Sequence, residues 1–152
     1  MKRFCLFLTL AITGCSSIQT KPEQEIVGVW SNPEVNGGQF YYQKVAYTSD
    51  GKKCSAGIGI GSTGELEYGF YVSTWKIIGD EIHLKVQSSS SEYVYVGETI
   101  IDQIIEVGKD TLQVKMIQPK PAYSEGMESY SREESLQPDQ ICELALRYSR
   151  NK

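Results

Sequence analysis

Apolar and polar residues alternate one by one along several stretches of the chain. In two of these stretches the apolar positions are Ile82, Leu84 and Val86, and Leu112, Val114 and Met116. Strict alternation buries one face of a strand and leaves the other face in water. The pattern therefore predicts strands near residues 26–30, 39–48, 53–60, 66–78, 81–87, 92–106 and 111–117.

Turn-forming residues separate the predicted strands at an even spacing. They lie at residues 36–38, 49–51, 61–64, 79–80 and 108–110, where Gly, Asn, Asp and Ser favour tight turns. The 10 Tyr and 14 Gly of the chain are also typical of strands and turns. Short, evenly spaced strands predict an all-β domain, either an antiparallel barrel or a sandwich. Closure into a barrel would remove exposed strand edges.

The pattern changes towards the C-terminus. Residues 118–137 are rich in Pro, Ser, Glu and Tyr and predict a loop, within which residues 128–132 could form a last strand. From Pro138 onwards, apolar residues recur at helical spacing, at Ile141, Leu144, Ala145 and Tyr148. Because Pro138 suits a first helical turn, the sequence predicts a short C-terminal helix.

The N-terminus predicts export. Two basic residues, Lys2 and Arg3, precede an apolar stretch over residues 4–12. This is typical of a secretory signal and too short to span a bilayer. The following Ile-Thr-Gly-Cys sequence resembles the lipobox of bacterial lipoproteins. The resemblance implies that residues 1–14 are a signal peptide and that Cys15 is acylated, which would anchor the protein to a membrane. The alternative is an ordinary signal with a chance Cys at its boundary.

The lipobox resemblance also implies a location in the cell envelope. Residue 16 is Ser rather than the Asp that tends to hold lipoproteins in the inner membrane, so a Gram-negative host would favour the outer membrane, facing the periplasm. Residues 15–25 are polar and include Pro22, and we interpret them as a lipidated flexible tether. Residues 26–152 then form one domain of ordinary size.

The charge balance restricts the partners of this domain. The chain has 15 basic and 19 acidic residues, and loss of Lys2 and Arg3 with the signal leaves 13 basic residues and a net charge of −6. An acidic domain has no electrostatic basis for binding nucleic acid or anionic lipid head groups. The expected partners are the membrane, through the acyl chains, and a small apolar ligand or an envelope protein.

Two cysteines remain in the exported domain, Cys54 and Cys142. An even pair of cysteines in an oxidising compartment predicts a disulfide, which would pin the C-terminal helix to the β domain. Two free buried thiols, or a catalytic Cys, are the alternatives.

Three segments resemble the lipocalin-like proteins. The Gly28-Val29-Trp30 sequence is similar to the Gly-x-Trp signature that opens their barrels, and residues 75–82 and 104–114 look like two of their hairpins. The resemblance covers residues 26–132 and implies an up-and-down barrel whose closed end is plugged by Trp30, with Gly28 allowing close backbone approach and Arg132 lying over the indole. Ile26 departs from the family, which prefers an aromatic residue there.

The motifs of enzyme chemistry lack their structural context. The Gly59-x-Gly61-x-x-Gly64 pattern matches a dinucleotide fingerprint, but no helical pattern follows it, so we interpret it as a glycine-rich hairpin or bulge. His83 is the only His and lies on the polar phase of its strand, which predicts a solvated side chain and no metal site. We therefore expect no cofactor, no catalytic residues and no enzymatic activity.

The strand aromatics are the remaining candidates for function. Four of them are predicted to line a ligand site: Tyr42, Tyr71, Tyr93 and Trp75. The first hypothesis is an envelope lipoprotein that binds a small apolar or amphipathic ligand in its barrel, since barrels of this size hold one small ligand or fill their interior. The alternative is a protein-interaction module, such as an envelope assembly factor or a periplasmic inhibitor. An open lumen favours the ligand, and a filled core favours the interaction module.

Overall fold

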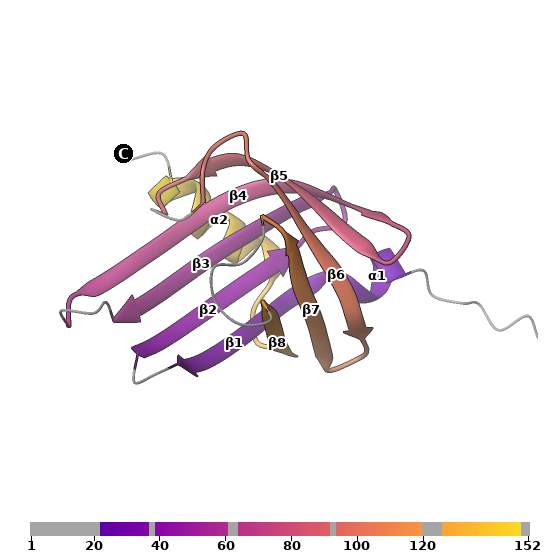
Figure 1. The fold of residues 1–152 in the computed structure, drawn as a ribbon, viewed down its shortest axis with the longest axis horizontal. Coiled ribbons are helices and arrows are strands. Elements are labelled where there is room, and N and C mark those ends of the chain that lie inside the picture. The colour runs from indigo at the N-terminus through magenta and orange to yellow at the C-terminus, as the bar shows by residue number, and fades with distance from the viewer. Residues whose placement is uncertain (1–21, 37–38, 61–63, 92–93, 120–125, 150–152) are drawn as a thin grey trace, which may run out of the picture.

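Eight antiparallel strands close into one barrel (Figure 1). The computed structural model describes residues 22–36, 39–60, 64–91, 94–119 and 126–149, without the side chains of residues 33–41 and 67. The strands are β1 (Gly28–Asn36), β2 (Gln39–Tyr47), β3 (Lys52–Ile60), β4 (Leu66–Ile78), β5 (Glu81–Ser89), β6 (Thr99–Val107), β7 (Thr111–Gln118) and β8 (Met127–Arg132). Each strand pairs with the next along the chain, and β8 returns to β1. The predicted antiparallel up-and-down barrel is confirmed, and the sandwich is excluded.

The barrel closes through a short last strand. β8 pairs with β1 at two positions, Trp30 opposite Arg132 and Ser31 opposite Ser131. β8 also pairs with β7 from Thr111 opposite Ser131 to Lys115 opposite Met127. The strand that the sequence placed at 128–132 therefore provides the closure of the barrel.

Two helices flank the barrel. The predicted C-terminal helix is confirmed as α2 (Pro138–Ser149), which lies behind β2, β3 and β4 in Figure 1. Its buried face packs on the outside of the barrel against the outward side chains of β1 to β4, in a cluster of Val29, Ala46, Cys54, Val72, Ile141, Cys142 and Ala145. The outer faces of these strands are therefore apolar where α2 covers them.

The N-terminal part of the domain differs from the prediction. Residues 22–26 form helix α1 (Pro22–Ile26) instead of the end of a flexible tether, and the first strand begins at Gly28 rather than at residue 26. Ile26 is fully buried and belongs to the barrel core. Burial of this side chain holds α1 against the barrel. The polar composition of residues 15–25 gave no indication of this contact.

The sixth strand is shorter than predicted. It begins at Thr99 instead of residue 92, because residues 94–98 form a turn. In this turn the Gly97 amide donates to the Val86 carbonyl at 3.0 Å, and Gly97 has a φ of +84°, which favours glycine. The fifth strand is longer than predicted and ends at Ser89 instead of residue 87.

The main core fills the end of the barrel next to α1. Its buried members are Ile26, Trp30, Val45, Tyr47, Ile82, Leu84, Val86, Ile100, Leu112, Val114 and Tyr130. Trp75, Ile77, Ile104 and Met116 pack against them. In the described part of the chain, no helix is long and apolar enough to cross a bilayer.

Candidate functional site

Trp30 and Arg132 close one end of the barrel. The Trp30 side chain is fully buried, and its Nε1 donates a hydrogen bond to the Ile26 carbonyl at 2.8 Å. The Arg132 guanidinium carbon lies 4.1 Å from the indole centroid, a cation–π arrangement. The structure thus brings together the two side chains that the family resemblance paired.

Arg132 also ties three chain segments to this end. Its Nη1 donates to the Val27 carbonyl at 3.0 Å, its Nη2 to the Glu25 carbonyl at 2.5 Å, and its Nε to the Lys109 carbonyl. These acceptors belong to α1, to the residue before β1 and to the turn between β6 and β7. A single guanidinium therefore joins three chain segments at the closed end of the barrel.

Gly28 makes room for this guanidinium. Its φ is +147°, in the region that side-chain-bearing residues rarely adopt. A Cβ atom at this position would clash with Nη1 of Arg132. Gly28 is therefore required both by its own backbone and by the close approach of Arg132.

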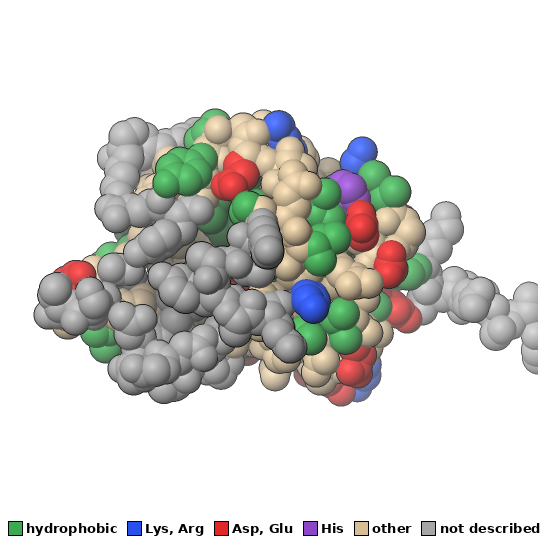
Figure 2. Space-filling model, viewed as in Figure 1, with side chains coloured by type: hydrophobic (Ala, Val, Ile, Leu, Met, Phe, Trp, Pro, Cys, Tyr) green, Lys and Arg blue, Asp and Glu red, His purple; other side chains and the backbone are tan. Residues whose placement is uncertain are grey.

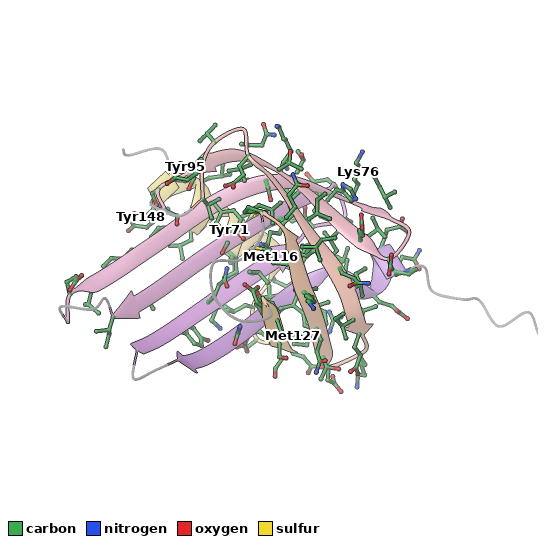
Figure 3. All side chains as sticks on the ribbon, viewed as in Figure 1. Tyr71, Lys76, Tyr95, Met116, Met127 and Tyr148 are labelled. Atoms are coloured by element: carbon green, nitrogen blue, oxygen red, sulfur yellow. A yellow bond between two sulfur atoms is a disulfide. The ribbon has the colours of Figure 1, made fainter. Side chains whose placement is uncertain are left out.

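A layer of polar side chains lies inside the barrel, among and next to the apolar core residues that surround Trp30 and form the floor of the barrel. Alternation places Gln43, Lys53, Ser55, Ser73 and Asp102 on the same strand faces as the core residues Val45, Tyr47, Trp75 and Ile100. All five polar side chains are buried. Tyr71 and Tyr130 complete the layer with their hydroxyl groups. Figure 3 shows Tyr71 and Met116 within the barrel outline, whereas Lys76 points away from it.

Lys53 is the positive charge of this layer. It is 4% exposed, its Nζ donates to the Tyr71 hydroxyl, and it lies 4.5 Å from the centroid of the Tyr71 ring. Burial opposes the charged form, but Tyr71, Tyr47 and Asp102 together hold the pKa of Lys53 above its ordinary value. The ammonium group is therefore charged at neutral pH.

Asp102 is a buried carboxylate without a hydrogen-bond donor. It is 6% exposed, and burial raises the pKa of Asp102 to about 6, with Lys53 opposing the rise and Glu128 adding to it. Among the described residues, no group donates a hydrogen bond to it. Among those same residues, no completely buried side-chain N or O atom lacks a partner. The carboxylate oxygens must therefore reach space that a water-sized group can occupy.

Hydrogen bonds join the rest of the polar layer. The Tyr130 hydroxyl contacts the Glu128 carboxylate and lies 3.3 Å from the Gln43 side-chain oxygen, and the Gln43 amide nitrogen donates to Ser55 Oγ at 2.6 Å. Burial, and then the charge of Glu128, raise the pKa of Tyr130 well above its ordinary value. Tyr130 is therefore a neutral hydrogen-bond donor, and its hydroxyl contacts the side chains of Glu128 and Gln43.

The four aromatics predicted to bind a ligand do not share one environment. Tyr71 lies in the polar layer. Trp75 belongs to the apolar floor, where its ring meets Tyr47 edge-on at 5.4 Å and its Nε1 donates to the Thr48 carbonyl at 3.2 Å. Tyr42 faces outwards next to Lys44, on the opposite face from Gln43, so it does not line the interior. Tyr93 lies outside the described residues, as does Cys15.

The two domain cysteines form the predicted disulfide. Cys54 of β3 and Cys142 of α2 are bonded with their Cα atoms 5.0 Å apart. The bond lies in the outer cluster between the barrel and α2, so its role is structural.

Sequence reasoning missed Lys53, Asp102 and Glu128 because polar residues are expected on the wet face of a strand. One signal could have found Lys53. A disulfide to a helix must lie outside the barrel, and alternation then turns the neighbour of Cys54 inwards. For Asp102, which lies between Ile101 and Gln103, the sequence holds no comparable signal that its side chain points into the barrel.

A hollow lies on the outer wall of the barrel, over strands β4, β5 and β6. It measures about 380 Å³ and is lined by Thr74, Trp75, Lys76, His83, Leu84, Lys85 and Thr99. His83, the purple side chain in Figure 2, is partly exposed and its Nε2 lies 2.8 Å from a Glu81 carboxylate oxygen. The described residues contain no group of three or more His, Cys, Asp or Glu side chains placed to hold a metal ion.

Comparison with known proteins adds one likeness. The chain matches no protein-family model and no curated protein. Among solved structures it is similar to a lipocalin-like protein from Bacteroides uniformis ATCC 8492, at 13% sequence identity and a TM-score of 0.43, over 72% of this chain and 98% of that chain. A likeness of this size carries no residue-by-residue correspondence, and the fold rests on the barrel topology itself.

Proposed function

We propose that this protein is a cell-envelope lipoprotein whose barrel binds a small amphipathic ligand without chemical conversion. The observation that carries the proposal is the polar layer inside the barrel, with the buried and hydrogen-bond-deficient carboxylate of Asp102. Burying polar groups costs free energy unless they are paired. A barrel interior that served stability alone would be filled by apolar side chains, as the floor around Trp30 is.

The order of the layers suggests how a ligand enters. The closed end is sealed by Trp30 and Arg132, and Gln43 on β2 and Tyr130 and Glu128 on β8 lie further along their strands from that end. Beyond these residues, Gly57 of β3 is paired with Gly69 of β4, so these inner positions carry no side chain. A ligand would enter with its polar head first, place the head at the polar layer and leave its apolar tail towards the open end.

A fluorescent apolar probe tests this proposal. N-phenyl-1-naphthylamine should bind the purified protein saturably and with one-to-one stoichiometry, with enhanced emission. Tyr71→Ala, inside the barrel, should weaken binding at least several-fold. Tyr42→Ala is the matched control, because it removes the same side chain from the outer face. Absence of saturable binding, or an equal loss in both variants, would contradict ligand binding in the barrel.

One observation favours the protein-interaction alternative. The outer end of the β3–β4 hairpin exposes apolar side chains, with Ile60 42% exposed, Leu66 58% and Tyr68 55%. In addition, β4 pairs with β5 only from Tyr71 onwards, so residues 66–69 lie beyond the β5 ladder. Apolar strand edges of this kind can add a strand from another chain. Cross-linking in intact cells through a photoreactive residue at position 68 would capture such a partner, with position 76 on the opposite end as the control.

The proposed anchor fits the direction of the barrel. Arg132 binds α1 to the closed end, so a tether that precedes α1 leaves the domain there. A protein anchored through Cys15 would then present its open end away from the membrane that holds it. This orientation suits a barrel that takes its ligand from the periplasm.

A further inference from the structure

The charges inside the barrel are unbalanced. Among the described side chains of the polar layer, Lys53 is positive, and Asp102 and Glu128 are negative. Lys53 donates to the Tyr71 hydroxyl, and Glu128 accepts from the Tyr130 hydroxyl. Asp102 accepts from no described group, although it is buried and its oxygens reach space that a water-sized group can occupy. The layer therefore lacks one positive charge and one hydrogen-bond donor, both at the same carboxylate.

We propose that the barrel binds the cationic head of an amine-bearing amphiphile, with the ammonium group paired to Asp102 inside the polar layer and the apolar tail directed to the open end. This inference rests on the proposed ligand-binding function and specifies the chemical class of the ligand. An ammonium group supplies both the missing charge and up to three donors, and charge-assisted hydrogen bonds of this kind are stronger than neutral ones.

The same layer disfavours an anionic head. A carboxylate entering the barrel would meet Lys53, but Lys53 is already engaged by Tyr71 and attracted to Asp102. It would also meet the two carboxylates of Asp102 and Glu128, and like charges at close range in a poorly solvated site repel strongly. The layer is therefore selective between two ligands that differ only in the sign of the head group.

Three probes with one tail separate head-group recognition from tail binding. We would titrate the purified protein with octylammonium, 1-octanol and octanoate, each below its micelle concentration, and follow heat release and tryptophan fluorescence. Trp75 lies in the floor of the barrel and is a natural reporter. We expect octylammonium to bind at least tenfold more tightly than 1-octanol, and octanoate to bind most weakly.

Asp102→Asn then tests the residue that the proposal names. This substitution keeps the shape of the side chain and removes its charge, so it should abolish the preference for octylammonium while leaving 1-octanol binding within about twofold. Asp110→Asn is the matched control, since Asp110 is an exposed carboxylate in the turn next to the closed end. It should leave all three affinities unchanged. A thermal melt of each variant shows that the fold is retained.

The outcomes distinguish the two levels of the proposal. If the three probes bind equally, or if octanoate binds most tightly, the cationic-head inference is wrong while ligand binding stands. If Asp102→Asn keeps the preference for octylammonium, the assignment to Asp102 is likewise wrong. If no probe binds saturably, both the inference and the proposed function fail.

Discussion

Arg132 combines a ring contact with three backbone hydrogen bonds at the closed end. The guanidinium lies over Trp30 and donates hydrogen bonds to the carbonyls of Glu25, Val27 and Lys109. A buried cation–π contact contributes about 2 kcal/mol. Because the side chain also satisfies backbone carbonyls of three segments, its loss would loosen α1 as well as the indole.

The first prediction compares truncations at these two residues. Trp30→Ala should destabilise the domain by about 3–5 kcal/mol, because it empties a fully buried aromatic site, and so should largely unfold a marginal domain. Arg132→Ala should be less severe and leave a folded protein. Urea unfolding followed by circular dichroism measures both. Arg147→Ala on the exposed face of α2 is the control, and an equal loss in Arg132→Ala and Arg147→Ala would contradict the role of Arg132.

The second prediction concerns Asp102 and pH. Its pKa is about 6 in the folded protein against 3.8 ordinarily, so the folded state holds this proton more tightly than the unfolded state. The stabilising contribution is complete below about pH 3.8 and is lost as the pH rises through 6. Asp102→Asn cannot ionise and so should not lose stability as the pH rises. It should raise the free energy of unfolding at pH 7 by at most about 3 kcal/mol relative to wild type, with little difference near pH 4.

Urea titrations of wild type and Asp102→Asn between pH 4 and pH 7.5 would measure this difference. The comparison cancels the titration of every other group that behaves alike in both proteins. Asp110→Asn should show no such pH-dependent gain. If Asp102→Asn is instead less stable than wild type at pH 7, the attraction of Lys53 outweighs the burial of the carboxylate, and the sign of the effect is wrong.

Single residues were the hardest part to predict from the sequence. Alternation sorts β2 into two faces, with Tyr42 on one and Gln43 on the other, but it does not say which face is inside. Tyr42 was predicted to line a ligand site, yet Gln43 lies inside and Tyr42 outside. The packing of α2 decides which face of β2 is outside, because α2 requires an apolar outer surface on the barrel. The residues of this contact are distant in sequence, so alternation alone does not reveal it.

At the scale of elements, α2 depends on contacts with the outer barrel wall. Its buried face is formed by Ile141, Cys142 and Ala145, and Tyr148 stacks on Phe70 of β4 with ring centroids 5.1 Å apart. A helix of 12 residues is marginal by itself in water. Packing on the barrel and the disulfide therefore both contribute to keeping it folded.

The third prediction tests the disulfide. Cys54 and Cys142 are 88 residues apart, and loop-closure entropy for a span of that length gives a stabilisation of up to about 4.6 kcal/mol. The double variant Cys54→Ser, Cys142→Ser should lose a large part of this and show faster hydrogen exchange in α2 than in the barrel strands. Thiol labelling of the oxidised wild-type protein should leave both cysteines unmodified. Labelling of both would contradict the bond.

Elements with strong periodicity were predictable from the sequence, and helix α1 was not. The strands β3, β4, β5 and β7 and the helix α2 follow from alternation or helical spacing and lie within a few residues of their predicted bounds. Helix α1 has only five residues, too few to show a period. Its fold depends on burial of Ile26 and on the hydrogen bond from Arg132, which is 107 residues from Glu25 in the sequence.

At the scale of the whole molecule, the two ends of the barrel have different roles. The closed end gathers α1, the β6–β7 turn and Arg132, and the opposite end carries the β3–β4 hairpin with its exposed apolar side chains. In Figure 1 α1 and the hairpin lie at opposite sides of the molecule. The proposed anchor before α1 would therefore leave the opposite end of the barrel, with its apolar hairpin, directed away from the membrane.

The last prediction tests that anchor. The basic start, the apolar stretch and the Ile-Thr-Gly-Cys sequence predict cleavage between Gly14 and Cys15 and acylation of Cys15. Two or three acyl chains hold a protein on a membrane far more stably than one, so the mature protein should partition into the detergent phase. Cys15→Ser should abolish this partition or accumulate the uncleaved precursor. Cys5→Ser is the control, since Cys5 lies within the segment that is removed and its loss should change neither processing nor partition. Mass spectrometry of the mature N-terminus settles the question, because an unmodified end at any other residue would leave the domain without its anchor and the proposed orientation of the barrel without its cause.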